Sequence, residues 1–352
     1  MKTKLVFVPQ YLRKSIFFLV LFFQISNGFS QDYRNASAYI NDFGRNETNV
    51  NSALMEYSKS IAFVDPEKRL QRSLDELILK FEKLNSILNI HDKGYKNDES
   101  LKNSLIDLNI SVIEYLKNED NDMNDYKEQS LLSLAEIENN FRKKDVAIEL
   151  LYSKFRKYEN TKRQFGIKYN IPIKNDPGFN IYEYNTNQNL IFYKINVLDE
   201  KLLVLIDNKD VIQIKECAHL IVSTCNQSLQ KTAIYKDYFS DRTLNDANIA
   251  FSEFFLNQDE VLIPVAVNFL TFSEQFQKTK CLFEENNGIM TIEEYNTEVR
   301  KYNDLKNKFN YALFSVNVNK NPLIDSWLKI NSDFLKNNIN FDIDNYRYVD
   351  TD

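Results

Sequence analysis

Apolar residues recur at steps of three and four along most of the chain, the spacing that places them on one face of an α-helix. The clearest run follows Asp65, which can cap a helix, and Pro66, which is tolerated in a first helical turn. Its apolar stripe consists of Leu74, Leu77, Ile78, Phe81, Leu84 and Leu88. The same spacing predicts a helix over about 101–117 and one long helix over about 123–165.

A short apolar run over 201–206 is compatible with a strand when taken alone. It continues a helical stripe that starts upstream, so we expect a helix there. That stripe consists of Leu190, Tyr193, Val197 and Leu198. Only six glycines and six prolines occur in 352 residues, and this scarcity of turn residues favours long elements over a many-stranded fold. The predicted fold class is therefore all-α.

The two halves of the sequence resemble each other at an offset of about 143 residues. The best stretch is a shared Y-x-x-D-x-[ST]-L helix opening at 95–101 and 238–244. Each half is expected to hold about four helices, the last of them long, with apolar residues seven apart that suit an antiparallel seam. These residues are Leu151, Tyr158 and Phe165 in the first half and Tyr295, Tyr302 and Phe309 in the second. We predict two tandem antiparallel helical bundles that form an internal repeat, with a capping box of Thr291 and Glu294 before the last helix.

This organisation predicts the domain boundaries. Residues 31–170 form the first bundle and residues 181–339 the second. Between them, 171–180 is a linker that holds two of the six prolines and is therefore expected to be extended. Residues 340–352 are an acidic tail.

The first thirty residues, 1–30, have the order of a secretory signal peptide: basic residues, an apolar run over 16–23, and small residues before Gln31. The run has about half of the ~20 residues that a membrane span needs. We expect cleavage near Ser30 and no transmembrane segment in the mature chain. No cysteine follows the run, so a lipid anchor is not expected, and the predicted location is the periplasm, the outer surface or the medium.

The net charge and the number of cysteines limit the expected partners and the expected disulfides. The formal net charge is −6 and no basic stripe is present, so nucleic acid is not an expected partner. Three cysteines, an odd number, argue against a disulfide framework. Cys217 and Cys225 lie about 12 Å apart along one predicted helix, too far for a bridge. We predict that both are small core residues.

The order of these features resembles the LIC-type surface proteins, a family of exported helical bacterial proteins. The resemblance covers most of the mature chain and rests on the segments 38–41, 98–101, 163–171, 294–296 and 301–303. It implies an exported, all-helical protein. The family's activity is not established, so no site residues are carried over, and members with a lipid-anchored cysteine differ from this chain.

Motifs for catalysis or metal binding do not come together in the sequence. Glu216 and His219 have the E-x-x-H spacing of a di-iron bundle, a site that needs two such motifs. The only other histidine in the sequence is His91, and the residue three before it is Leu88, so the second ligand set is missing. No G-x-S-x-G elbow or glycine-rich phosphate loop occurs. The acidic run over 119–125 lacks the glycine and the closing glutamate of a calcium loop. We predict no enzyme activity, no catalytic residue, no cofactor and no metal.

Aromatic residues are abundant, with 20 tyrosines and 26 phenylalanines, and most fit core-facing positions of helices. An aromatic group beside the linker is the candidate ligand site, because ligand sites favour domain interfaces. Its residues are Tyr182, Tyr184, Phe192 and Tyr193. Two functions follow: a non-enzymatic surface or periplasmic module for protein interaction or scaffolding, or a binding protein for a small apolar or peptide ligand in a bundle core or in the cleft between the repeats.

Overall fold

The computed structural model describes residues 35–45, 67–118, 123, 126–173, 180–236, 240–285 and 290–338. The predicted signal peptide, the Asp65 cap, the centre of the linker and the acidic tail lie outside these ranges. Within them the chain is helical and contains no β-strand. The all-α prediction is therefore confirmed.

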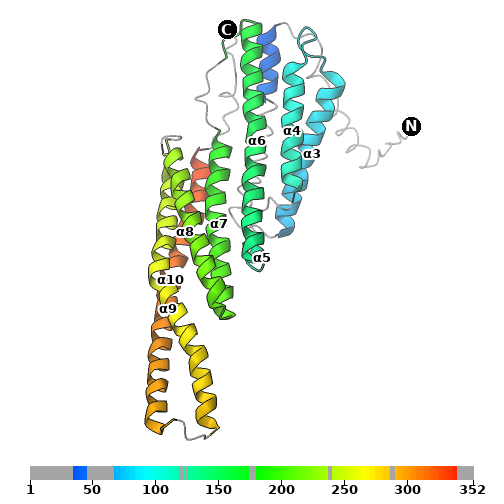
Figure 1. The fold of residues 1–352 in the computed structure, drawn as a ribbon. Coiled ribbons are helices and arrows are strands. Elements are labelled where there is room, and N and C mark those ends of the chain that lie inside the picture. Colours follow the sequence, from blue (N-terminus) through cyan, green and yellow to red (C-terminus); the bar gives the residue numbers. More distant parts are fainter. Residues whose placement is uncertain are drawn as a thin grey trace, which may run out of the picture.

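The first group of helices lies toward one end of the molecule (Figure 1). α4 packs between α3 and α6, and the short α5 lies at the start of α6 against α7. The elements of this group are a helix over 36–45, α3 (Glu67–His91), α4 (Ser100–Lys117), α5 (Tyr126–Gln129) and α6 (Leu134–Lys168).

The second group forms the other end. α8 packs against α7 and α9, and α9 packs along α10. The apolar run 201–206 lies inside α7, as predicted. The elements are α7 (Ile181–Asp207), α8 (Val211–Tyr235), α9 (Thr243–Glu284) and α10 (Ile292–Asn338).

One helix prediction is wrong. The single helix expected over 123–165 is interrupted before Leu134, where Ser133 starts α6 as a new helix. The Ser133 hydroxyl accepts the backbone N–H of Glu136 at 3.3 Å, and the Glu136 carboxylate accepts the backbone N–H of Ser133 at 2.9 Å. This capping box satisfies two amide groups that a helix start leaves unpaired. The signal is present in the sequence as Ser-x-x-Glu.

The capping box predicted before the last helix is confirmed. The Thr291 backbone N–H donates to Glu294 at 2.8 Å, and the Glu294 N–H donates to the Thr291 hydroxyl at 3.2 Å. At the two Y-x-x-D-x-[ST]-L stretches, the aspartate accepts the backbone N–H of the first helical residue, two positions after it. Asp98 accepts the backbone N–H of Ser100 at 3.1 Å, and Asp241 accepts that of Thr243 at 3.0 Å.

A tight turn joins α3 to α4. Gly94 has φ 78°, and a Cβ atom there would lie 2.3 Å from the carbonyl oxygen of Asp98, so only glycine fits. Lys96 and Asn97 also have positive φ, 53° and 61°, and the Asp98 N–H donates to the Tyr95 carbonyl at 3.0 Å. This turn holds Asp98 where its carboxylate accepts the backbone N–H of Ser100.

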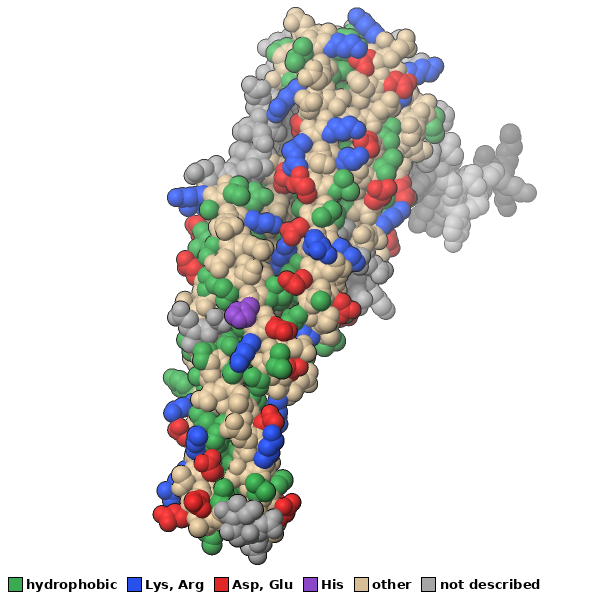
Figure 2. Space-filling view, viewed as in Figure 1, with side chains coloured by type: hydrophobic (Ala, Val, Ile, Leu, Met, Phe, Trp, Pro, Cys, Tyr) green, Lys and Arg blue, Asp and Glu red, His purple; other side chains and the backbone are tan. Residues whose placement is uncertain are grey.

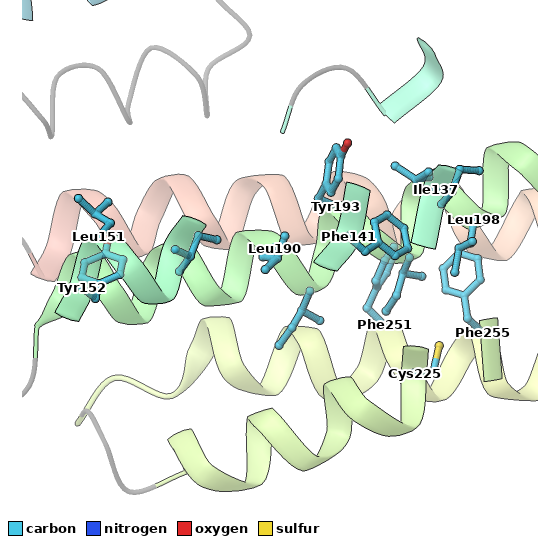
Figure 3. Close-up of a cluster of buried hydrophobic side chains, with 14 of the residues drawn as sticks. Ile137, Phe141, Leu151, Tyr152, Leu190, Tyr193, Leu198, Cys225, Phe251 and Phe255 are labelled. Carbon is cyan, nitrogen blue, oxygen red and sulfur yellow. The ribbon is translucent and has the colours of Figure 1, made fainter. Parts of the chain in front are cut away.

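The apolar cores of the two groups join into one continuous cluster. Figure 3 shows the part where α6 and α7 meet, with Phe141 and Tyr193 facing each other at a ring-centroid distance of 6.3 Å. Cys225 lies in the same cluster, and both Cys217 and Cys225 are fully buried, as predicted. The two groups therefore contact each other directly through α6 and α7.

Candidate functional site

The second group carries a projecting arm. We define the arm as residues 265–284 of α9 and 292–312 of α10, which extend as a two-helix hairpin beyond the ends of α7 and α8 (Figure 1). A hairpin of only two helices leaves most of its surface to water. Such a shape offers a long contact surface on a fixed support.

Stacked aromatic rings hold the arm together. The ring centroids of Phe269 and Phe309 lie 5.1 Å apart, those of Phe276 and Tyr302 4.7 Å apart, and those of Phe283 and Tyr295 4.1 Å apart. These distances lie within or just below the range in which aromatic pairs attract each other beyond simple area burial. The predicted heptad stripe of Tyr295, Tyr302 and Phe309 is thus the seam that faces α9.

An apolar stripe on α10 remains exposed where the arm leaves the body. Tyr311 is 75% exposed, Phe314 67% and Val318 51%. Their spacing of three and four residues puts them on one helix face. This face lies off the seam, since Phe309, Ala312 and Val316 are the buried residues of the same stretch. We call these three residues the α10 stripe.

Exposed aspartates flank the α10 stripe. Asp304 lies one heptad before Tyr311, and Asp325 lies one heptad after Val318, so both fall on the same face of α10. Asp304 also pairs with Lys308 at 2.8 Å. Over the visible face of the molecule, acidic and basic side chains are interspersed (Figure 2). The α10 stripe therefore has an apolar centre, with the Asp304–Lys308 pair before it and Asp325 after it.

Above the arm, α10 is attached to the body by buried polar contacts. The Lys320 ammonium lies 2.6 Å from the Asp199 carboxylate of α7, and the two side chains are only 6% and 5% exposed. Burial raises the pKa of Asp199, while the charge of Lys320 opposes that rise. Breaking such a pair leaves one charge buried without compensation, which is costly.

Amide side chains extend this polar attachment. Asn331 of α10 accepts a hydrogen bond from Asn185 at 2.8 Å and donates one to Asn189 at 3.1 Å. The Trp327 indole donates to Asn248 of α9 at 2.8 Å, and Asn248 donates to the Gln188 side chain at 2.6 Å. These bonds satisfy polar groups inside the bundle. Hydrogen bonds to α7 and α9 thus position the C-terminal half of α10.

The four aromatic residues of the predicted ligand site all lie on α7, but the structure does not bring them to one surface. Tyr184 is 1% exposed and packs against Tyr235 and Phe334. Phe192 stacks on Trp327 at 3.8 Å.

Tyr193 is 2% exposed and faces α6, with the Lys144 ammonium 4.9 Å from its ring centroid. Tyr182 is partly buried against the core. Tyr184 and Tyr193 point to opposite sides of α7, since nine residues turn a helix by about 900°. Both are core residues, and their role in ligand binding stays a prediction.

Histidines and cysteines lie apart from one another. His91 ends α3 and is exposed, and both Glu216 and His219 are exposed on α8. Burial raises the pKa of the Cys217 and Cys225 thiols to about 12, so both are protonated and unreactive at neutral pH. Cys281 is exposed on the arm. Among the described residues, no three of the His, Cys, Asp and Glu side chains gather as a metal site would require.

The α10 stripe and the Asp199–Lys320 pair were not predicted as functional residues. A signal for the stripe exists in the sequence, because Tyr311, Phe314 and Val318 follow helical spacing but fall off the heptad of Tyr295, Tyr302 and Phe309. Two apolar faces on one helix indicate two contacts. The ion pair joins residues of two helices far apart in sequence, and spacing alone does not reveal it.

Comparison of the chain with protein-family models, with curated proteins and with solved structures finds no match. None of the helices in the described ranges is long and apolar enough to cross a membrane.

Proposed function

We propose that this chain is an exported, non-enzymatic helical protein that binds another protein through the α10 stripe and serves as an interaction or scaffold module. The observation that carries the proposal is the exposure of Tyr311, Phe314 and Val318 on one face of α10. Another face of the same stretch is already buried in the protein. Large apolar side chains that are grouped on a surface mark interaction sites more often than isolated ones do. Aromatic residues are also enriched among the residues that dominate binding energy.

The charges beside the stripe favour a different protein over a second copy of this chain. An antiparallel pairing of two α10 helices would place Asp304 opposite Asp325, and a parallel pairing would place each aspartate opposite itself. In both arrangements Asp325 meets a like charge, which disfavours binding, and Lys308 compensates only the charge of Asp304. A partner that fits has an apolar centre and a basic residue opposite Asp325.

A glutamine variant tests this proposal. Y311Q/F314Q/V318Q removes the apolar groups at exposed positions, so the melting temperature is expected to stay close to that of the unaltered chain. The complex that the chain forms in native extracts is expected to disappear. L79Q is the matched control, since Leu79 is 63% exposed on α3, close to the exposure of Phe314. Retention of the complex by the glutamine variant, or a complex that proves to be a homodimer, would contradict the proposal.

Export is the second part of the proposal, supported by the order of charge, apolar run and small residues before Gln31. Mass spectrometry of the protein from cell envelopes and medium should find a mature N-terminus near Gln31. Protease treatment of intact cells then separates the outer surface from the periplasm. A chain that keeps its N-terminal thirty residues and stays in the cytoplasmic fraction would contradict export.

We also propose that the two groups are tandem repeats and that the arm is an enlargement of the second. Supporting this, α3 and α8 each have 25 residues and fall in register at the offset of about 143, as do the starts of α4 and α9. The last helices depart from this offset, because buried residues near their ends coincide when α6 and α10 are paired 169 residues apart. These pairs are Tyr158 with Trp327, Lys162 with Asn331, and Phe165 with Phe334.

The alternative function, binding of a small apolar or peptide ligand, requires access to the aromatic residues of α7. Tyr184 and Tyr193 fill the core, so a ligand that reached them would have to displace packed side chains. The exposed α10 stripe requires no such rearrangement. For this reason we place the interaction surface on α10.

A further inference from the structure

The aromatic seam of the arm has the same period on both helices. Phe269, Phe276 and Phe283 are seven residues apart on α9, and Tyr295, Tyr302 and Phe309 are seven apart on α10. In the structure each step of seven along α9 is matched by a step of seven backward along α10. The seam is therefore a regular antiparallel heptad ladder.

Such a ladder does not distinguish its own register from the next one. A shift of α10 by one heptad toward the tip would bring Phe309 opposite Phe276 and Tyr302 opposite Phe283. Val316 would then face Phe269. The shifted seam keeps three apolar pairs, because Val316, Phe309 and Tyr302 would each meet a phenylalanine of α9, while Tyr295 would lie past the end of α9. Hydrophobic contact therefore stabilises both arrangements. Register in helical seams is commonly fixed by buried polar residues instead.

Buried polar contacts of that kind occur above the arm. Lys320 pairs with Asp199, and Asn331 bonds to Asn185 and Asn189. After a one-heptad shift, Trp327 would face Asp199, and the buried carboxylate would lose its cation. The ladder permits two registers, but the ion pair is compatible with one.

We infer that the Asp199–Lys320 pair, assisted by Asn331, is a register lock that holds α10 in one of two registers available to the arm. Opening the lock lets α10 move along α9 by one heptad, which also displaces the α10 stripe relative to the body. Movements of one element past another by whole helical turns are an established form of switching in proteins. The inference rests on the ladder and the lock, and stands apart from the proposed binding function.

Engineered disulfides read the register directly, in a C281S background that removes the exposed native thiol. The ladder places Ser273 opposite Leu305 in the observed register and opposite Ala312 in the shifted one. With the lock intact, S273C/L305C should cross-link and S273C/A312C should not. In D199L/K320M/N331L, the S273C/A312C pair should become cross-linked. D304L/K308M removes a surface pair within α10 and should leave the pattern unchanged.

A second variant is designed to favour the shifted register over the observed one. K320L/W327K moves the lysine one heptad along α10, so that it meets Asp199 only in the shifted register. The S273C/A312C link should then exceed the S273C/L305C link. The inference is overturned if the A312C pair stays unlinked in D199L/K320M/N331L while the L305C pair still forms. Continued dominance of the L305C link in K320L/W327K would overturn it equally.

Discussion

The two groups of helices are similar in secondary structure but differ in what their last helix packs against. In the first group, α6 packs through apolar residues such as Tyr158 and Phe165, and its ion pairs to other helices, such as Lys154–Asp107, are partly exposed. In the second group, α10 is held to the body by Lys320, Asn331 and Trp327, and its other half projects with α9 as the arm. Exposed ion pairs contribute little to the position of a helix, whereas buried polar contacts such as those of α10 fix the position of a helix that also carries the arm.

The largest expected effect is on the buried ion pair. K320M leaves Asp199 buried without a cation and should lower the free energy of unfolding by about 3–5 kcal/mol, measured by chemical denaturation. D199L/K320M should recover most of that loss, because it removes both charges. K329M disrupts the exposed Lys329–Asp333 pair and should cost under about 1 kcal/mol. Equal losses in K320M and K329M would show that the buried pair does not hold α10.

The next prediction tests whether the arm is destabilised independently of the body. F276A removes a buried ring of the ladder, a change that typically costs about 3–5 kcal/mol in a core. Because no other helix of the described residues packs around the arm, we expect the loss to be local. Hydrogen exchange should quicken over 270–284 and 292–305, while amides in α4 and α6 keep their protection. Faster exchange throughout the chain would mean that the arm is not a separate unit of stability.

Helix caps provide a smaller, matched contrast. S133A and T291A each remove a capping box and should cost about 1 kcal/mol locally. S133A acts on α6 inside the body, so it should lower the midpoint of global unfolding. T291A acts at the tip of the arm and should leave that midpoint unchanged while the first turns of α10 exchange faster. A drop in global stability with T291A alone would contradict this assignment.

The smallest effect concerns acid. Burial opposes ionisation of Asp98, but hydrogen bonds from Lys168, Ser100 and Tyr169 outweigh it and lower the pKa to about 2 from 3.8. A carboxylate with a depressed pKa stabilises the fold above its unfolded pKa and loses that contribution as pH falls. The denaturation midpoint should therefore decline between pH 4 and pH 2. D98N should remove this part of the decline, and an identical pH profile in D98N would contradict it.

Much of the fold could be predicted from the sequence because helical spacing is a local signal. The stripe from Leu77 to Leu88 and the capping box at Thr291 gave α3 and the start of α10. The break at Ser133 was missed because apolar spacing continues on both sides of it and only the cap marks it. The projection of the arm depends on where α7 and α8 end relative to α9, which is a property of packing. Exposure of Phe314 and burial of Tyr184 are likewise decided by neighbours from other helices.

Photo-cross-linking in intact cells tests the central claim most directly, namely that α10 presents a surface to another protein. A photoreactive amino acid is placed at Phe314, and at Leu79 as the control of similar exposure. We expect one discrete adduct with a different protein from position 314 and none from position 79. Absence of an adduct at 314, or the same adducts at both positions, would contradict it.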